Sequence, residues 1–161
     1  MAVNIHIKID GIEGMSEVTG FEKQIQVESW AWGMSMPTNF GASTGGSAGK
    51  VNLQDISFTH MMDKASPKLM EACCTGKHIK DAVMVFCKAG GDAAMPFLKL
   101  TMTDLLVSSV QVGGGSNDTP MESVTLAFRE YKIEYQEQDN KGAKKGGPVI
   151  AGFDVQKNKK A

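Results

Sequence analysis

Residues 41–50 read "GASTGGSAGK", a glycine-rich run that ends in Gly-Lys. A backbone without side chains can turn several N–H groups toward one phosphate, and a following lysine adds positive charge. The phosphate loop of nucleotide-binding proteins has glycine five residues before its last glycine, a hydroxyl residue after the lysine, and then a helix. Here those positions hold Thr44 and Val51, and residues 51–62 are strand-like. The run therefore predicts a mobile loop and no nucleotide site.

A second group with possible chemistry is Cys73, Cys74 and His78, with His60 and Asp63 shortly before them. Zinc and iron sites have characteristic spacings such as CxxC or HxxxH, and neither spacing occurs in this chain. Both adjacent cysteines fall on the apolar stripe of a predicted helix, where free thiols act as small hydrophobic residues. We therefore expect no metal site and no cofactor.

Three histidines, His6, His60 and His78, are the available bases for nucleophilic catalysis. His6 is predicted on the polar side of the first strand. Paired carboxylates of the glycosidase kind are not excluded, because their pairing is spatial. No recognisable catalytic constellation can be assembled from these residues, so we expect that the protein is not an enzyme.

Length and charge limit the remaining classes of function. The 161 residues suit one domain, and 17 Lys and Arg against 18 Asp and Glu leave a net charge of -1. This balance gives no electrostatic reason to expect nucleic acid or an anionic membrane as a partner. No segment approaches the roughly 20 apolar residues of a membrane span, so no membrane insertion is expected. The N-terminus lacks a basic-then-apolar signal peptide, and the three cysteines include Cys87 at no regular spacing. We expect cytoplasmic folding with reduced thiols, and export, if any, without the usual signal.

Apolar residues alternate with polar ones along most of the chain, beginning with Val3, Ile5, Ile7 and Ile9. This period of two is typical of half-buried strands. Several runs change side part-way, which requires a bulge or a cover on both faces, from the same chain or from another subunit. The runs that change side are 25–32, 51–62 and 124–135, and further strands are predicted at 82–87, 97–112 and 149–155.

One helix is predicted among these strands. Ser66 can cap it, Pro67 suits its first position, and Gly76 suits a left-handed closing position. The pattern as a whole predicts a mainly β protein, a closed or nearly closed β-barrel of about eight strands with one short helix after the third. The residues expected on the core-facing stripe of the helix are Leu69, Met70, Cys73 and Cys74.

The segment Trp30-Ala31-Trp32 places two large aromatic residues on one side of a strand, with Ser29 and Gly33 beside Ala31 on the other. One interpretation is that both tryptophans fill the barrel core. The other is that the strand has two covered faces, one of which belongs to an interface. The sequence leaves both open.

Six motifs together resemble one known family. They are "MAVNIHIKIDGIEG", "WAWGMS", "GSAGKVNLQDISFTHMMDKASPKLMEACCTGKH", "KAGG", "LLVSSV" and "GAKKGGPV". In this order, over nearly the whole chain, they resemble the haemolysin-coregulated protein (Hcp) family, the inner-tube proteins of the bacterial type VI secretion apparatus.

The resemblance implies one domain over residues 1–161, a closed barrel of two packed, mostly antiparallel sheets with one flanking helix. It implies hexameric rings that stack into a tube, which a contractile sheath drives out of the cell. It also implies small effector proteins carried in the lumen, and contacts with the spike protein, the sheath and the baseplate. The chain, ending at Ala161, resembles the plain tube subunit and not a version fused to a toxin.

The resemblance further implies two sites. The loop of about residues 35–50 is expected to reach the next ring, and residues 29–32 to lie near the lumen wall. Family members often have a hydroxyl residue where this chain has Ala31, which bears on effector preference. The expected stacking residues are Asn39, Phe40, Gly41, Ser43, Thr44, Ser47 and Lys50, and the expected lumen residues are Ser29, Trp30, Ala31 and Trp32.

Two other classes of function remain as alternatives, a monomeric small-ligand or carbohydrate-binding barrel and a hydrolase that depends on the histidines.

Overall fold

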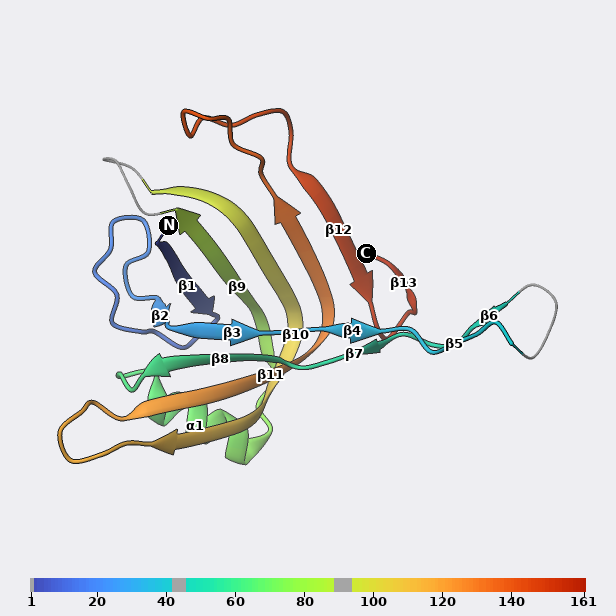
Figure 1. The fold of residues 1–161 in the computed structure, drawn as a ribbon. Coiled ribbons are helices and arrows are strands. Elements are labelled where there is room, and N and C mark those ends of the chain that lie inside the picture. Colours follow the sequence, from blue (N-terminus) through green and yellow to red (C-terminus); the bar gives the residue numbers. More distant parts are fainter. Residues whose placement is uncertain (1, 42–45, 89–93) are drawn as a thin grey trace.

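The structure, a computed structural model, describes residues 2–41, 46–88 and 94–161 (Figure 1). In these residues nine strands form one strongly curved sheet, four more form two short ribbons, and one helix, α1, lies below the sheet. All strand pairs are antiparallel. The elements are β1 Val3–Ile9, β2 Ile25–Val27, β3 Ser29–Ala31, β4 Met34–Ser35, β5 Thr38–Asn39, β6 Ser47–Ala48, β7 Asn52–Leu53, β8 Ile56–Met61, α1 Ser66–Thr75, β9 Ile79–Lys88, β10 Met95–Gly113, β11 Met121–Tyr135, β12 Val149–Asp154 and β13 Lys159–Lys160.

The predicted mainly β fold with one helix is confirmed, whereas the number of strands was underestimated. The basic tail after residue 155, which the sequence left without structure, contains β13, and its pairing with β12 includes Phe153 opposite Lys160. Backbone hydrogen bonding drives this pairing, and a lysine side chain on an edge strand keeps its charge in water.

The predicted changes of side at residues 25–32 and 51–62 are points where the chain passes from one pairing to another. β2 pairs with β1, but after Glu28 the chain continues as β3, which pairs with β8. The Glu28 N–H donates to the carbonyl of Thr59 at 2.8 Å and so fixes the crossing point. Similarly, β7 pairs with β4 in a ribbon, and β8 returns to the main sheet beside β11. The apolar face changes because the partner strands change.

β2 and β3 lie at two ends of one path of paired strands. The path runs from β2 through β1, β9, β10 and β11 to β8 and β3. Because β2 and β3 are consecutive, the chain itself joins the two ends of this path at Glu28. Within the described ranges, no strand pairing links β2 to β3 or to β8. The structure therefore shows an antiparallel, curved sheet and does not show a closed barrel.

The long strands β10 and β11 carry the curvature of the sheet (Figure 1). The first half of β11 pairs with β8 and its second half with β12, so β11 belongs to both ends of the fold. Its register with β10 shifts between Val107 and Ser109, a bulge in β10. Asp104, also in β10, has a φ of 54°, an unusual value for a residue with a Cβ atom. Both irregularities lie in β10. The change of the apolar face that the sequence predicts within residues 124–135 lies on β11, opposite them.

Helix α1 confirms the predicted position but corrects its start. Its N-cap is Ala65, not Ser66, because the Ala65 carbonyl accepts the Leu69 N–H at 2.9 Å as the first bond of the helix. The Asp63 carboxylate accepts the Ala65 N–H at 2.8 Å in the preceding turn. The Ser66 hydroxyl instead accepts the Asp63 N–H at 3.2 Å. Gly76 closes the helix with φ 63° and ψ 35°, the left-handed conformation expected of a C-terminal glycine.

The predicted core-facing stripe of α1 is partly wrong. Leu69 is fully buried and Cys73 is half-buried, but Cys74 is exposed, and Ala72 takes its place against the core. The stripe is centred on the spacing i, i+3 and i+6 from Ser66, so a residue one step further on points to solvent.

The exposure of the three thiols predicts their order of reaction with a thiol reagent such as Ellman's reagent. We expect Cys74 to react first, Cys73 more slowly, and Cys87 at least about 100-fold more slowly than Cys74 until the protein is unfolded. Burial also raises the pKa of the Cys87 thiol, which lowers its reactive thiolate fraction. Peptide mapping of the modified residues at successive times measures this order, and equal rates at Cys74 and Cys87 in the folded protein would contradict it.

His6 corrects the prediction of a polar outer face for β1. Its neighbours Ile7 and Ile9 are buried as expected, but His6 is also buried, because the segment after β1 folds back over it. The imidazole stacks on the Phe21 ring at 4.8 Å between centroids, and its Nε2 makes a 3.2 Å hydrogen bond with Ser16 Oγ. Alternation alone could not reveal this cover, because it comes from a loop.

Burial also lowers the pKa of His6 below its ordinary value of 6.5, because the folded site solvates the charged imidazolium poorly. Above pH 6.5 both the folded and the unfolded chain hold neutral imidazole, so the full contribution to stability is present. As the pH falls below that value the unfolded chain binds the proton first, and the free energy of unfolding decreases. We expect His6→Gln to flatten this part of the profile in urea titrations between pH 7 and about 5. If the free energies of unfolding of the two proteins differ by the same amount at every pH in that range, protonation of His6 is not coupled to folding.

Candidate assembly and cargo surfaces

The described parts of the predicted loop, residues 35–41 and 46–50, belong to an extended arm in the structure. Two ribbons of two residues per strand build it: β4 pairs with β7, and further out β5 pairs with β6. Pro37, which has no N–H, interrupts the ladder between them, and its carbonyl accepts the Gly49 N–H at 2.8 Å. Figure 1 shows this arm reaching well beyond the body of the protein. We use "the arm" below for residues 34–41 and 46–53.

The arm is anchored at its base by Trp32. The indole Nε1–H donates to the Gln54 carbonyl at 2.9 Å, and the indole ring packs edge-on against Tyr131 at 4.8 Å between centroids. The Gln54 N–H in turn donates to the Gly33 carbonyl at 3.0 Å. The inner ribbon, β4 with β7, still lies beside the sheet, where Met34 and Leu53 share a pocket with Tyr131 and Phe153. Among the described residues, no further strand pairs with the outer ribbon of β5 and β6. A two-stranded ribbon of this kind is marginally stable alone in water, so its shape favours contact with another surface.

The described stacking candidates lie in the outer half of the arm. Asn39 pairs with Ser47 across the ribbon, and its side-chain oxygen accepts the Gly41 N–H at 3.1 Å. Phe40 lies over Gly46 and is 80% exposed, the largest exposed fraction among the large apolar residues of the described ranges. Lys50 is exposed on the returning strand side of the arm. The two other candidates, Ser43 and Thr44, lie outside the described residues.

The backbone of the arm also settles two motif questions. Val51 leads into β7 and β8, so a strand and not a helix follows the Gly-Lys pair, as predicted. Residues 45–49, "GGSAG", have the GxSxG spacing of a hydrolase nucleophile, but Ser47 pairs in β6 of the arm and does not stand between a strand and a helix.

The lumen candidates Ser29, Trp30 and Ala31 form β3, and all three are exposed. The Ser29 hydroxyl makes a 2.5 Å hydrogen bond with Thr59 Oγ1 on β8, and Trp30 packs edge-on against Phe86 at 4.8 Å between centroids. Trp32 is half-buried and belongs to the base of the arm. The two tryptophans therefore have different roles: Trp32 packs against the core, whereas Trp30 covers Phe86 and still presents part of its surface to solvent.

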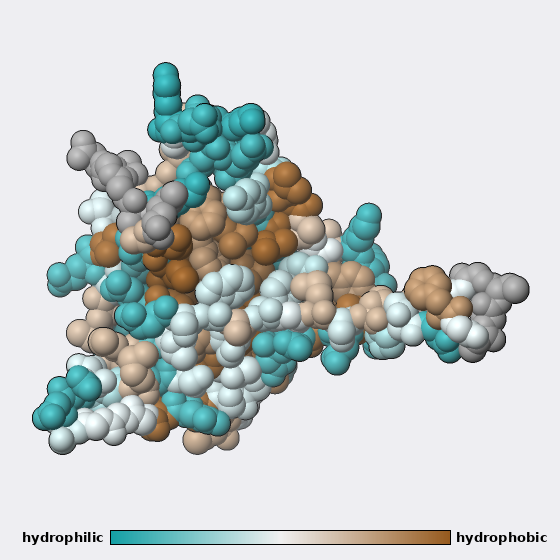
Figure 2. All heavy atoms as spheres, viewed as in Figure 1, coloured by the Kyte–Doolittle hydropathy of each residue, from teal (hydrophilic) through white to brown (hydrophobic). Residues whose placement is uncertain are grey.

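An apolar surface that the sequence analysis missed lies near the start of β12. Val149 is 74% exposed and Ile150 is 51% exposed, and Tyr135 opposite Val149 on β11 is also exposed. Figure 2 shows apolar side chains gathered in the hollowed centre of this face, above the β3–β4 run. The sequence did contain a signal for this surface. Residues 149–151 are all apolar and lack the alternation of a strand with one face in water.

The edge of β12 next to these residues is open. Within the described part of the chain, β13 pairs only with Phe153 and Asp154, and the Ala161 N–H adds one bond to the Gly152 carbonyl. The outer backbone groups of residues 149–151 therefore face away from any described strand. An open edge that carries exposed valine and isoleucine favours pairing with another chain.

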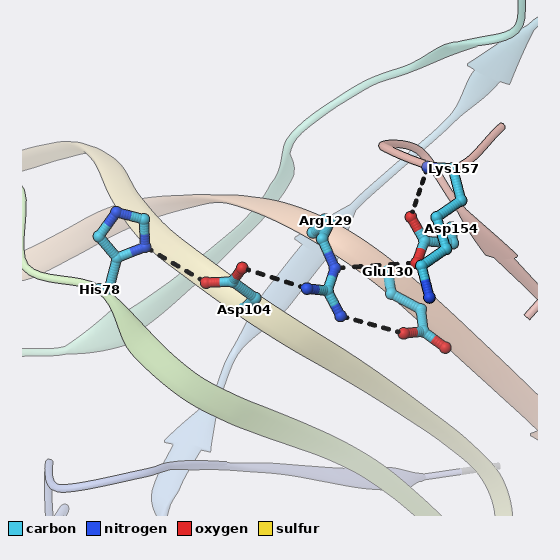
Figure 3. A network of polar contacts seen from close by, with 6 residues as sticks. All are labelled: His78, Asp104, Arg129, Glu130, Asp154 and Lys157. Carbon is cyan, nitrogen blue, oxygen red and sulfur yellow. Dashed lines mark hydrogen bonds and ion pairs between the residues drawn. The ribbon is translucent and has the colours of Figure 1, made fainter.

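A network of polar side chains holds β12 and the segment between α1 and β9 to the bend of β10 (Figure 3). Asp104 contacts His78 Nδ1 at 3.2 Å and the Arg129 guanidinium at 3.6 Å, and Arg129 also lies 3.6 Å from Glu130 and 3.8 Å from Asp154. Most of these groups are partly exposed, so each ion pair contributes little alone. Figure 3 draws His78, Asp104, Arg129, Glu130, Asp154 and Lys157.

Within the described ranges, no cluster of three or more histidine, cysteine or acidic side chains has the geometry of a metal site. In the same part of the chain, no helix has both the length and the apolar character needed to cross a membrane.

The sequence and the structure were compared with known proteins. A profile of the family described as "Type VI secretion system effector, Hcp" matches residues 6–135. The chain belongs to this family. It is 44% identical to the protein hcp1 of Pseudomonas aeruginosa, with the whole of both chains aligned. The crystal structure of Hcp1 from Salmonella typhimurium superposes with a TM-score of 0.84 at 36% identity, over 100% of both chains. A structure described as a type six secretion system protein gives 0.92 at 32% identity, over 99% of this chain and 100% of the other.

Membership of the Hcp family confirms the resemblance drawn from the sequence motifs. Hcp proteins are secreted structural tube proteins of type VI secretion and not enzymes, and they are oligomeric, which supports self-association of this chain.

Proposed function

We propose that the chain is a single-domain subunit, residues 1–161, of a type VI secretion inner tube. Six copies form a ring, rings stack into a tube, and the lumen carries small effector proteins. The domain closes as a barrel across Glu28, where β2 and β3 join the two ends of the sheet. The protein folds in the cytoplasm and leaves through the secretion apparatus without a signal peptide. Its other partners are the spike protein, the contractile sheath and the baseplate.

The arm is the single observation that carries this proposal beyond membership of the family. Its outer ribbon pairs with no other described strand, it projects from the body, and it carries Phe40, which is 80% exposed. A monomer gains nothing from such an element, whereas a stacked ring offers it a surface to cover. The arm is therefore the stacking element, with Phe40 as its main apolar contact.

Residues 29–32 are proposed as the lumen wall. β3 is exposed along its whole length, and the partly exposed Trp30 offers a flat aromatic surface to a bound protein. Ala31, which stands between two aromatic residues, adds no hydroxyl there, so cargo binding at this point depends more on apolar contact than on hydrogen bonds.

Replacing Phe40 by aspartate tests the stacking role. We expect rings of unchanged mass but stacking weakened about tenfold or more, because a carboxylate replaces the apolar contact. Electron microscopy of the purified protein at several concentrations measures ring number per stack, and Phe40→Leu is the matched apolar control. Loss of the ring itself in Phe40→Asp would assign the arm to contacts within a ring, and unchanged stacking would remove Phe40 from the interface.

A further inference from the structure

Four methionines gather at the opposite end of the protein from the arm. Met61 and Met121 lie directly across from each other where β8 ends and β11 begins. Met15 and Met62 come from the neighbouring segments, and the Met62 N–H donates to the Pro120 carbonyl at 2.9 Å. We call Met15, Met61, Met62 and Met121 the methionine face.

The methionine face is accessible in a single chain. Met61 is 52% exposed, Met15 and Met121 are also exposed, and Met62 is half-buried. Three of the four, Met15, Met61 and Met62, line a shallow depression of about 210 Å³. Methionine side chains are flexible and polarisable, so such a surface adapts to an inserted apolar or aromatic group.

The same depression is acidic, and the arm is not. Glu28 and Asp63 line the depression beside the methionines. In contrast, residues 34–53 contain a single charged residue, Lys50, which is exposed. Apolar and electrostatic complementarity therefore coincide: an exposed phenylalanine and a lysine on the arm match methionines and carboxylates in the depression.

The placement of the two surfaces gives the direction of assembly. The chain leaves the arm through β7 and runs along β8 to Met61, so the methionine face lies at the end of β8 that points away from the arm (Figure 1). An arm therefore meets the methionine face of another copy when subunits follow one another head to tail. Contacts between two different surfaces of identical chains close into a ring or extend into an open stack, depending on the rotation between neighbours. Two surfaces at opposite ends of the chain favour the open stack.

We propose that the methionine face is the receptor for the arm of the next ring, with Phe40 inserted between Met15 and Met61 and Lys50 near Glu28 and Asp63. This assignment rests on the proposed stacking of rings and adds to it the surface that receives the arm. The occupant is a second copy of this chain.

Disulfide cross-linking tests the contact itself. In a Cys73→Ser, Cys74→Ser background, Phe40→Cys and Met61→Cys are placed in one chain, and copper-phenanthroline with dissolved oxygen removes two protons and two electrons from each thiol pair to form the bond. We expect linked chains longer than a dimer on a non-reducing gel, and less linkage as rings are diluted below the stacking range. Each single variant, and Phe40→Cys combined with Thr75→Cys on the exposed end of α1, are the controls and should give none.

Met61→Glu tests the energetics. We expect rings of normal mass and normal circular dichroism, with stacking weakened about tenfold, whereas Met61→Leu should stack like the parent protein. If the parent rings stack but Met61→Glu stacks equally well and no Phe40–Met61 cross-link forms, this inference is wrong and the proposed function stands. Cross-links that persist undiminished in separated rings would place the contact within a ring and would also overturn it. A parent protein that forms no rings or stacks at any concentration would overturn both.

Discussion

Replacing His60 by leucine is expected to destabilise the protein by about 3–5 kcal/mol. His60 on β8 and Glu122 on β11 are cross-strand neighbours, and the Nε2–H of the imidazole donates to Glu122 Oε1 at 2.7 Å. Both side chains are fully buried, and the second carboxylate oxygen has no hydrogen-bond partner among the described residues. Removing the histidine therefore leaves a buried carboxylate without a donor, which costs far more than losing an exposed pair.

The double variant His60→Leu, Glu122→Leu is the decisive control. Because it removes both polar groups together, we expect it to recover most of the stability, to within about 1 kcal/mol of the parent. His78→Leu breaks the exposed contact with Asp104 and should change stability by less than about 1 kcal/mol. Urea unfolding at pH 7 and fixed protein concentration measures all three. A loss in the double variant as large as in His60→Leu would mean that packing volume, and not the unpaired carboxylate, sets the effect.

Ile150→Asp is expected to lower the affinity of ring formation at least about 100-fold, because an interface core excludes unpaired carboxylates. Ile150 is half-exposed on the open edge of β12, next to Val149, and exposed apolar residues on an unpaired edge are covered in most soluble proteins. We infer that a neighbouring subunit covers this edge in the proposed ring. The isolated chain should remain folded, since the side chain packs little within its own domain.

The test of this edge is the dependence of ring mass on protein concentration. Ile150→Val keeps the apolar character and should assemble normally, and Lys141→Asp places the same charge in the exposed segment before β12 without effect on assembly. If Ile150→Asp forms rings as readily as the parent, the β12 edge lies outside the interface.

The regular elements could be predicted from local chemistry. Alternation of apolar and polar residues indicates β1, and Pro67 and Gly76 indicate the start and the end of α1. These signals are reliable because each depends on residues close together in sequence. Burial of His6 could not be predicted, since the Phe21 loop that covers it comes from elsewhere in the chain. The exposure of Cys74 depends on how the helix is rotated against the sheet, which a broad apolar stripe does not fix.

The candidate surfaces could be predicted from the sequence only in part. Phe40 stands out in sequence as one large apolar residue among small polar ones, and the structure leaves it exposed as that contrast suggested. The paired strands of the arm gave no such signal, because two-residue ladders around Pro37 are too short to show a period. The methionine face was equally hidden: Met121 lies opposite Met61 only through the pairing of distant strands, and Met15 reaches Met61 from the segment between β1 and β2.

The mass of the purified protein in solution tests the central claim most directly. Size-exclusion chromatography with multi-angle light scattering, run over a range of protein concentrations, should give a species of six times the mass of one chain, with larger multiples of that mass at high concentration. A protein that remains a strict monomer at every concentration would contradict the account.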